Sequence, residues 1–219
     1  SRMANLRVFV SSTCFDLSVL RAQLRTFIEG VGFEPVMSEY HDVVYDPRTH
    51  THSACIDEVE SCDMVVVIIG SRFGGKAIPA AVSKTDLDAI ATASKSAEIL
   101  KRPDNMSITQ LEVLKAVECA VPVFAFVDDR VLHDHATYEK NKGKAIIDQI
   151  EFSSIEKPET AHFIFEFINF LRHRSTNNGV SGYGKYQDIE LALKRQWSGL
   201  FQRLLLEQRN RAEGVRRID

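Results

Sequence analysis

The segment Leu6-Arg7-Val8-Phe9-Val10-Ser11-Ser12-Thr13-Cys14-Phe15-Asp16-Leu17 decides the fold. Its apolar run, rich in β-branched and aromatic side chains, predicts a strand over residues 7–10 that stops at three small hydroxyl residues. Asp16 then opens an amphipathic helix predicted over residues 16–29. A strand that ends in a polar turn at a helix start is how α/β proteins begin a ligand crevice. The unpaired backbone N–H groups of the helix point into that crevice, so a polar or anionic group is expected there, such as a nucleotide phosphate or ribose.

The rest of the chain alternates strands and helices. The segment Met64–Ile69 is continuously apolar, which is typical of a strand covered on both faces at the centre of a parallel sheet. Further strands are predicted over 33–37, 121–127 and 180–186, and helices over 52–61, 107–120, 163–174 and 188–211. This order predicts an α/β fold with a mostly parallel sheet of about five strands and helices on both faces.

The predicted domain organisation is one α/β domain with a helical extension. The domain spans residues 4–150, and residues 151–219 form a helical C-terminal extension that packs on it. Residues 76–106 are polar and rich in Ala, Ser and Lys, and a connection of that length is typical of an insertion or lid. The extension ends in exposed charge without a natural stop, so we expect the chain to be a piece of a longer protein.

Composition excludes several classes of function. The 219 residues carry a net charge of −3, which argues against nucleic acid as the main partner. The longest apolar run is far shorter than the roughly 20 residues of a membrane-spanning helix, and no signal peptide pattern is present. The four cysteines show no C-x-x-C spacing and the seven histidines no ligand spacing, so we expect no metal, and free thiols in a reducing, cytoplasmic compartment.

Segments at the carboxyl ends of parallel strands converge on one crevice. Here they include the first polar turn, the loop after the second strand, the loop after Ile69 and the start of the helix at Ser107. The expected ligand-lining residues are Ser11, Ser12, Thr13, Asp16, Tyr40, Gly70, Ser71, Arg72, Phe73, Gly74 and Ser107. Gly70 and Gly74 allow a close backbone approach, and Arg72 offers a cation to a phosphate. The alternative is that these glycines only serve turns, because neither G-x-G-x-x-G nor a Walker lysine is present.

Glu112 is the candidate catalytic acid. Ser107-Ile108-Thr109-Gln110 forms a capping box, and Glu112 lies one turn into the helix that it opens. A carboxylate there stabilises an oxocarbenium-like ribosyl transition state or attacks the anomeric carbon. The alternative is a solvated helix glutamate.

The roles of three other polar residues stay open from the sequence. Asp16 is either an N-cap or a site residue, and Arg21 either reaches the crevice or pairs with an acid. Tyr40 either stacks on a base or packs its own loop.

Four segments together resemble one family of domains. They are Val8-Phe9-Val10-Ser11-Ser12-Thr13-x-x-Asp16-Leu17, Cys62 through Gly74, Ser107-Ile108-Thr109-x-x-Glu112-x-x-x-Ala116, and Pro122 through Val127. The chain resembles the TIR-like family of uncharacterised N-terminal domains with the VFVSST-x-x-DL signature. These domains precede NACHT or other STAND ATPases and tetratricopeptide repeats, and one occurs in telomerase-associated protein.

The resemblance implies a flavodoxin-like sheet, as in TIR domains and nucleoside deoxyribosyltransferases. In both, a glutamate on the helix before the fourth strand serves N-glycosidic bond cleavage, and Glu112 falls on that position. The resemblance therefore implies a TIR-like effector domain that cleaves NAD or a related nucleotide, which is a substrate rather than a cofactor. It implies activation when a STAND ATPase partner or repeat domain in a longer chain oligomerises it, in bacterial antiphage or innate-immune-like defence.

Two other functions stay open from the residues. In the first, the same surfaces form a non-catalytic module for self-association or protein interaction, which the long C-terminal helix favours. In the second, the crevice is a nucleotide-signal sensor that binds its ligand without consuming it. Turnover that appears only at high protein concentration distinguishes the enzyme from the module, and binding without product distinguishes the sensor.

Overall fold

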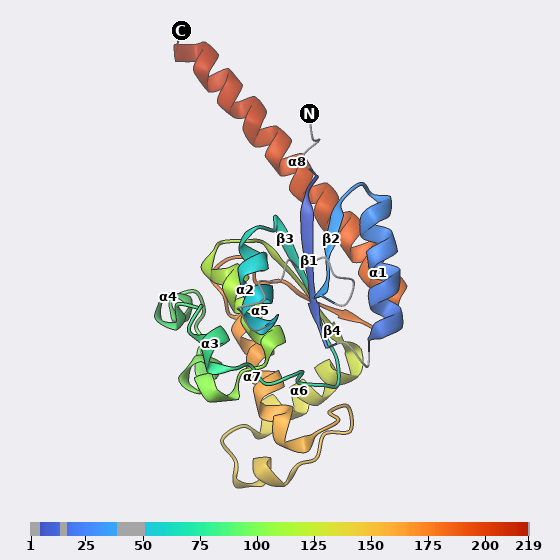
Figure 1. Ribbon diagram of the computed structural model, residues 1–219, viewed down its shortest axis with the longest axis vertical. Helices are drawn as coiled ribbons and strands as arrows, with labels where there is room; N and C mark the ends of the chain where they lie inside the picture. The colour runs from blue at the N-terminus through green and yellow to red at the C-terminus, as the bar shows by residue number, and fades with distance from the viewer. Residues whose placement is uncertain (1–4, 14–16, 39–50, 219) are drawn as a thin grey trace. The chain divides into compact units, whose positions relative to one another are not determined.

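The fold is built on a five-stranded parallel sheet (Figure 1). The computed structural model describes residues 5–13, 17–38 and 51–218. The strand order is β2-β1-β3-β4-β5. The strands are β1 (Arg7–Ser12), β2 (Glu34–Val36), β3 (Met64–Ile69), β4 (Val123–Asp128) and β5 (Val180–Tyr183). This order is that of flavodoxin-like proteins, so the predicted α/β class with a parallel sheet is confirmed.

Strand β1 continues two residues beyond its predicted end. Ser11 pairs with Val67 and Ser12 with Ile68 in the parallel register with β3. Ser11 and Ser12 therefore belong to the strand, and Thr13 directly follows its end. All six residues of β3 are buried, as their continuous apolar character predicts.

Helices cover both faces of this sheet. They are α1 (Ser18–Gly30), α2 (Thr51–Glu60), α5 (Ile108–Glu118), α6 (Asp129–Asn141) and α7 (Ala161–Arg172). Buried side chains of α2, α5 and α7 form one cluster with alternate strand residues such as Phe9, Val65 and Val67. Helix α1 lies on the opposite side of the sheet from α2 and α5, with Leu24 and Ile28 buried (Figure 1). Helix α1 begins at Ser18, two residues after the predicted start.

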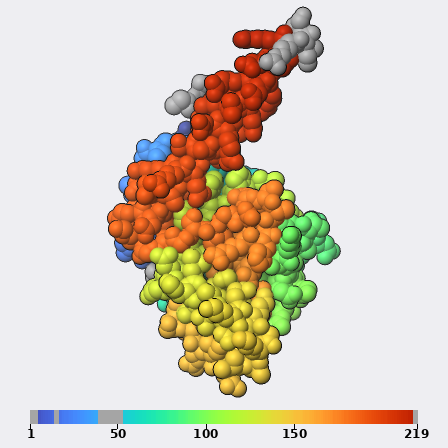
Figure 2. All heavy atoms as spheres, turned by 180° about the vertical axis from the view of Figure 1, so that it is seen from behind, coloured from blue at the N-terminus to red at the C-terminus, as the bar shows by residue number. Residues whose placement is uncertain are grey.

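The segment 76–106 folds into short helices that pack into the main core. It contains α3 (Pro79–Val82), α4 (Leu87–Ala91) and two 3-10 turns, Glu98–Lys101 and Pro103–Asn105. Ala81, Ile90, Ile99 and Met106 are buried in the main cluster. The Ser94 hydroxyl donates a hydrogen bond of 2.8 Å to the carbonyl of Phe170, at the end of α7. Figure 2 shows this segment in green, packed against the body of the domain.

Residues 185–219 form a second compact unit, separate from residues 1–184. It consists of one helix, α8 (Tyr186–Ile218). The backbone N–H of Lys185 donates to the Asp188 carboxylate at 3.1 Å and closes the helix start. Phe201, Leu204 and Leu205 are about half exposed or more on this helix. Within the ranges that the structure describes, no helix combines the length and apolar character needed to cross a membrane.

Candidate functional site

The candidate site is a cavity of about 790 Å³ at the carboxyl ends of β1 and β3. Segments far apart in the sequence form its wall. The lining includes Ser12 and Thr13 after β1, Cys55 of α2, residues 72–76 after β3, Asn105, three residues of α5 (Ile108, Thr109, Glu112), and residues 156, 157, 159, 160 and 163. The convergence of strand ends and helix starts is the one that a parallel sheet imposes.

Glu112 is buried in the wall of this cavity, with 7% of its surface exposed. The predicted capping box fixes its helix. The Ser107 hydroxyl accepts the N–H of Gln110 at 3.1 Å, and the Ser107 N–H donates to the Gln110 side chain at 3.3 Å. The Ser11 hydroxyl donates to Oε1 of Glu112 at 3.0 Å. Glu112 is thus largely removed from solvent and receives an oriented hydrogen bond from Ser11, unlike a solvated helix residue.

A side chain of α1 contacts the polar end of β1. The Arg21 guanidinium donates to the Ser12 hydroxyl, and Arg21 is 2% exposed. The Ser12 hydroxyl lies 3.3 Å from the carbonyl of Thr13, to which it donates. Arg21 thus contacts the end of β1 from α1, and it is not among the described residues that line the cavity. A cation directly behind the strand end favours negative charge nearby.

Gly74 brings its loop close to both walls of the cavity. Its φ is +95°, in the left-handed region that favours glycine. A Cβ atom at this position would lie 3.2 Å from Thr109 Oγ1 and 3.2 Å from Thr13 Cγ2. The glycine is therefore required for the approach of this loop to α5 and β1, and not only for a turn.

Charges of both signs line the cavity. Three are cationic (Arg72, Lys76, Lys157) and three are acidic (Glu112, Glu156, Glu159). Arg72 forms an ion pair with Glu156, and the backbone N–H of Glu156 donates to the carbonyl of Ser71 at 3.0 Å. The side chain of Arg72 is thus oriented by a residue from another segment, at the rim of the cavity.

The structure brings most of the expected residues together. Ser12, Thr13, Arg72, Phe73, Gly74 and Glu112 line one cavity, and Ser11 contacts Glu112 directly. Gly70 and Ser71 lie in the same loop but are not among the described lining residues. Ser107 is fully buried and acts as the helix cap, and it lines a separate small pocket of about 20 Å³. Asp16 and Tyr40 lie outside the described residues.

The sequence did not reveal one wall of the cavity. Glu156, Lys157, Glu159, Thr160 and Phe163 reach it from the start of α7 and the turn before it. No periodic pattern marks this segment, because its place depends on how α7 packs over the sheet end. Cys55 also lines the cavity, although its spacing on α2 predicts only a core thiol.

Over the described ranges, no cluster of three or more His, Cys, Asp or Glu side chains is arranged to hold a metal ion.

Residues 7–198 match the family described as "Domain of unknown function (DUF4062)". The comparison with curated proteins finds no match.

Proposed function

The chain belongs to the DUF4062 family of domains of unknown function, and from the site itself we propose that it binds NAD or a related nucleotide and cleaves its N-glycosidic bond. One observation carries this proposal: Glu112, buried and hydrogen-bonded by Ser11, lines a cavity at the carboxyl end of a parallel sheet. Ligands of open α/β sheets bind at that edge. A buried carboxylate facing such a ligand is suited to stabilise positive charge on a sugar.

The reaction with NAD is a hydrolysis. The bond between ribose C1′ and the nicotinamide nitrogen breaks, and its electron pair goes to the nitrogen. Water adds to C1′ and releases one proton, so that the products are ADP-ribose and nicotinamide. Glu112 stabilises the positive charge that develops on the ribose and accepts a proton from the water. The donor from Ser11 holds Oε1 in place and so fixes the orientation of the carboxylate in the wall of the cavity.

The remaining wall suits the polar parts of a nucleotide. Gly74 brings the loop backbone close to Thr13 and Thr109, so that the loop backbone forms part of the cavity wall. Arg72, Lys76 and Lys157 place cations around the opening for phosphate groups. Phe73 and Phe163, whose ring centroids are 5.8 Å apart, offer an apolar surface for a base or for the nicotinamide ring.

The resemblance of the sequence to the TIR-like family supports this assignment. In TIR domains and nucleoside deoxyribosyltransferases the reactive glutamate lies on the helix before the fourth strand, and Glu112 lies on α5, directly before β4. We propose that the domain acts in bacterial antiphage or innate-immune-like defence, in the cytoplasm. Its activation would follow when a STAND or NACHT-type ATPase in a longer chain brings copies together.

A second candidate function is self-association without catalysis. Helix α8 carries Phe201, Leu204 and Leu205, all about half exposed or more, at a spacing that places them on neighbouring turns. A second copy of the chain would bury these side chains. Sedimentation of the native protein and of Leu204→Glu tests this candidate: a concentration-dependent dimer that the substitution abolishes supports it, and a monomer up to high concentration contradicts it.

The catalytic proposal is tested by product analysis. Concentrated protein is incubated with NAD, and nicotinamide is separated by chromatography, with Glu112→Gln as the test variant. Glu29→Gln is the matched control, because Glu29 is an exposed glutamate at the end of α1. Nicotinamide from the native protein and the control, but not from Glu112→Gln, supports the proposal. Equal turnover by Glu112→Gln, or none by any protein even when a fused oligomerisation domain joins the copies, contradicts it.

A further inference from the structure

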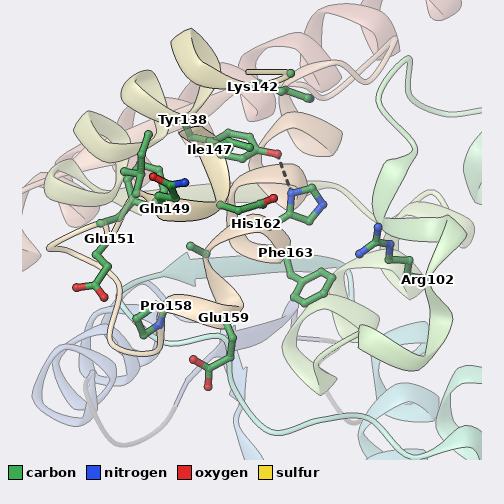
Figure 3. A pocket seen from close by; sticks show the side chains of 15 residues that line it. Arg102, Tyr138, Lys142, Ile147, Gln149, Glu151, Pro158, Glu159, His162 and Phe163 are labelled. Carbon is green, nitrogen blue, oxygen red and sulfur yellow. Dashed lines mark hydrogen bonds between the residues drawn. The ribbon is translucent and has the colours of Figure 1, made fainter. Parts of the chain in front are cut away.

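A second cavity of about 680 Å³ adjoins the first. It lies between α6, the start of α7 and the segment that joins them, and it shares Glu159 and Phe163 with the first cavity. Figure 3 shows its labelled side chains, with Tyr138 and His162 at the centre. The turn Pro158–Thr160 and the first residues of α7 therefore form a wall between the two cavities.

One side of the second cavity is a fixed network of polar groups. The Tyr138 hydroxyl donates to Oε1 of Glu166 at 2.6 Å and lies 2.9 Å from Nδ1 of His162. Lys142 Nζ lies 2.6 Å from the same Glu166 oxygen. Burial opposes ionisation of Glu166, but the hydrogen bonds from Lys142 and Tyr138 outweigh it and lower the pKa of that carboxyl. Glu166 thus stays ionised and orients the tyrosine and the lysine that line the cavity.

Charged groups of both signs line the cavity. In Figure 3 the side chains of Arg102, His162 and Lys142 lie on one side, and the carboxylates of Glu151 and Glu159 lie on the other. Asp148 is a third acidic residue of the lining. The side chain of Arg102 makes no ion pair or hydrogen bond with any residue in the described ranges. A guanidinium without a protein partner at a cavity is available to bind an anion.

Aromatic rings connect this side to the first cavity. Phe163 lies 5.6 Å from His162, His162 lies 5.9 Å from Tyr138, and Tyr138 lies 6.5 Å from Phe152, measured between ring centroids. All four residues line the second cavity. Rings in this arrangement offer faces and edges against which a planar base packs.

We propose that this second cavity is a binding site for a mononucleotide, separate from the Glu112 cavity. Its phosphate is held by Arg102, with Lys142 and His162 beside it. Its base packs along Tyr138 and Phe152. The acidic groups Glu151 and Glu159 accept hydrogen bonds from ribose hydroxyls or from an exocyclic amine. A ligand with an anion at one end, a planar ring and several donors matches all three features of this lining.

The site is tested by calorimetric titration of the whole chain with AMP and with adenosine. Two variants alter the cavity without touching the Tyr138 network: Arg102→Gln removes the cation, and Ile147→Trp fills the space that Ile147 lines. Arg172→Gln is the charge-matched control, since Arg172 is exposed and lines neither cavity. Gly74→Ala reports on binding in the first cavity, because Gly74 lines that cavity only and its substitution is expected to weaken nucleotide binding there.

We expect AMP to bind the native chain and adenosine to bind at least tenfold more weakly. Arg102→Gln and Ile147→Trp are each expected to weaken AMP binding by about tenfold or more, because a charge-assisted contact or the cavity itself is lost. Arg172→Gln and Gly74→Ala are expected to bind AMP within twofold of the native chain. The proposal is overturned if AMP does not bind at millimolar concentration, or if Gly74→Ala weakens binding and the two cavity variants do not. A loss of turnover by Glu112→Gln bears only on the first cavity, so the two proposals fail independently.

Discussion

The hydroxyl of Ser11 donates a hydrogen bond of 3.0 Å to Oε1 of Glu112, across a separation of 101 residues. Ser11 lies next to the last residue of β1 and Glu112 lies in the second turn of α5. Both side chains are buried. The bond joins the end of a central strand to the helix that carries the candidate acid, so the orientation of the carboxylate depends on the packing of α5 against the sheet.

Ser11→Ala should separate positioning from binding. Without the donor, the Glu112 carboxylate loses its fixed orientation, and we expect turnover to fall by about tenfold or more. Nucleotide affinity should stay within twofold, because Ser11 is not among the described residues that line the cavity. Ser83→Ala removes a serine hydroxyl that bonds the carbonyl of Ala80 on α3, away from the site, and is the control. An equal loss of affinity and turnover would show that Ser11 shapes the cavity instead.

Gly74→Ala should disrupt the loop at the cavity. The left-handed φ of +95° and the two contacts at 3.2 Å leave no unstrained place for a methyl group. We expect a loss of about 1–2 kcal/mol in the free energy of unfolding, measured with denaturant, and weaker nucleotide binding. Gly75→Ala is the matched control, because its added Cβ meets no atom within 4 Å. Similar effects of both substitutions would contradict the account of this loop.

The side-chain amide of Asn177 forms hydrogen bonds with the backbone of Val123 at the start of β4, as a neighbouring strand would. Its amide accepts the Val123 N–H at 2.7 Å and donates to the Val123 carbonyl at 2.8 Å, while its φ is +50°. We expect Asn177→Ala to lower the free energy of unfolding by about 2–3 kcal/mol, through both bonds and the backbone conformation. Asn177→Gly tolerates the left-handed backbone conformation, so it should lower the free energy of unfolding only by the part that the two hydrogen bonds contribute. Asn178→Ala is the control, and an equally small effect of all three would contradict this role.

The folded domain should lose stability as the pH falls below about 6.5. His135 is buried, and Asn169 accepts a hydrogen bond from its Nε2 at 2.8 Å. Burial lowers the pKa of His135, although the hydrogen bond with Asn169 and the nearby Glu139 act in the opposite direction. Below the ordinary histidine pKa of 6.5 the unfolded chain therefore binds more protons than the folded chain, and stability that is complete at higher pH is lost as the pH falls.

Denaturant unfolding between pH 5.5 and 7.5 measures this effect. The uptake of one proton changes the free energy of unfolding by at most about 1.4 kcal/mol per pH unit. We expect the free energy of unfolding to increase with pH over this range in the native chain, and this increase to disappear in His135→Leu. His133→Leu is the control, because His133 is exposed on the same helix. A slope that persists in His135→Leu would assign the pH dependence to another group.

The sequence predicts the regular elements well where local patterns determine them. The bounds of β3 agree with those predicted, because six consecutive apolar residues have few other conformations. The capping box at Ser107 also forms as predicted, since its two bonds lie within four residues. By contrast, the start of α1 and the end of β1 are each displaced by two residues, because Ser11 and Ser12 continue to pair with β3.

The site is less predictable because it is assembled from distant segments. The sequence places Glu112, Gly74 and the hydroxyl residues at one edge, as topology alone requires. The pair of Arg72 with Glu156 and the wall from residues 156 to 163 depend on the packing of α7, which no local pattern reports. The burial of Glu112 likewise follows from tertiary contacts, and spacing alone is equally compatible with a solvated helix residue.

The most direct test of the central claim measures binding and turnover of NAD together in Glu112→Gln. The exchange of one carboxylate oxygen for an amide keeps the shape of the side chain and the contact with Ser11. The account predicts that Glu112→Gln binds NAD within a few fold of the native protein and releases nicotinamide at least about 100-fold more slowly. Unchanged release of nicotinamide by Glu112→Gln would contradict the account.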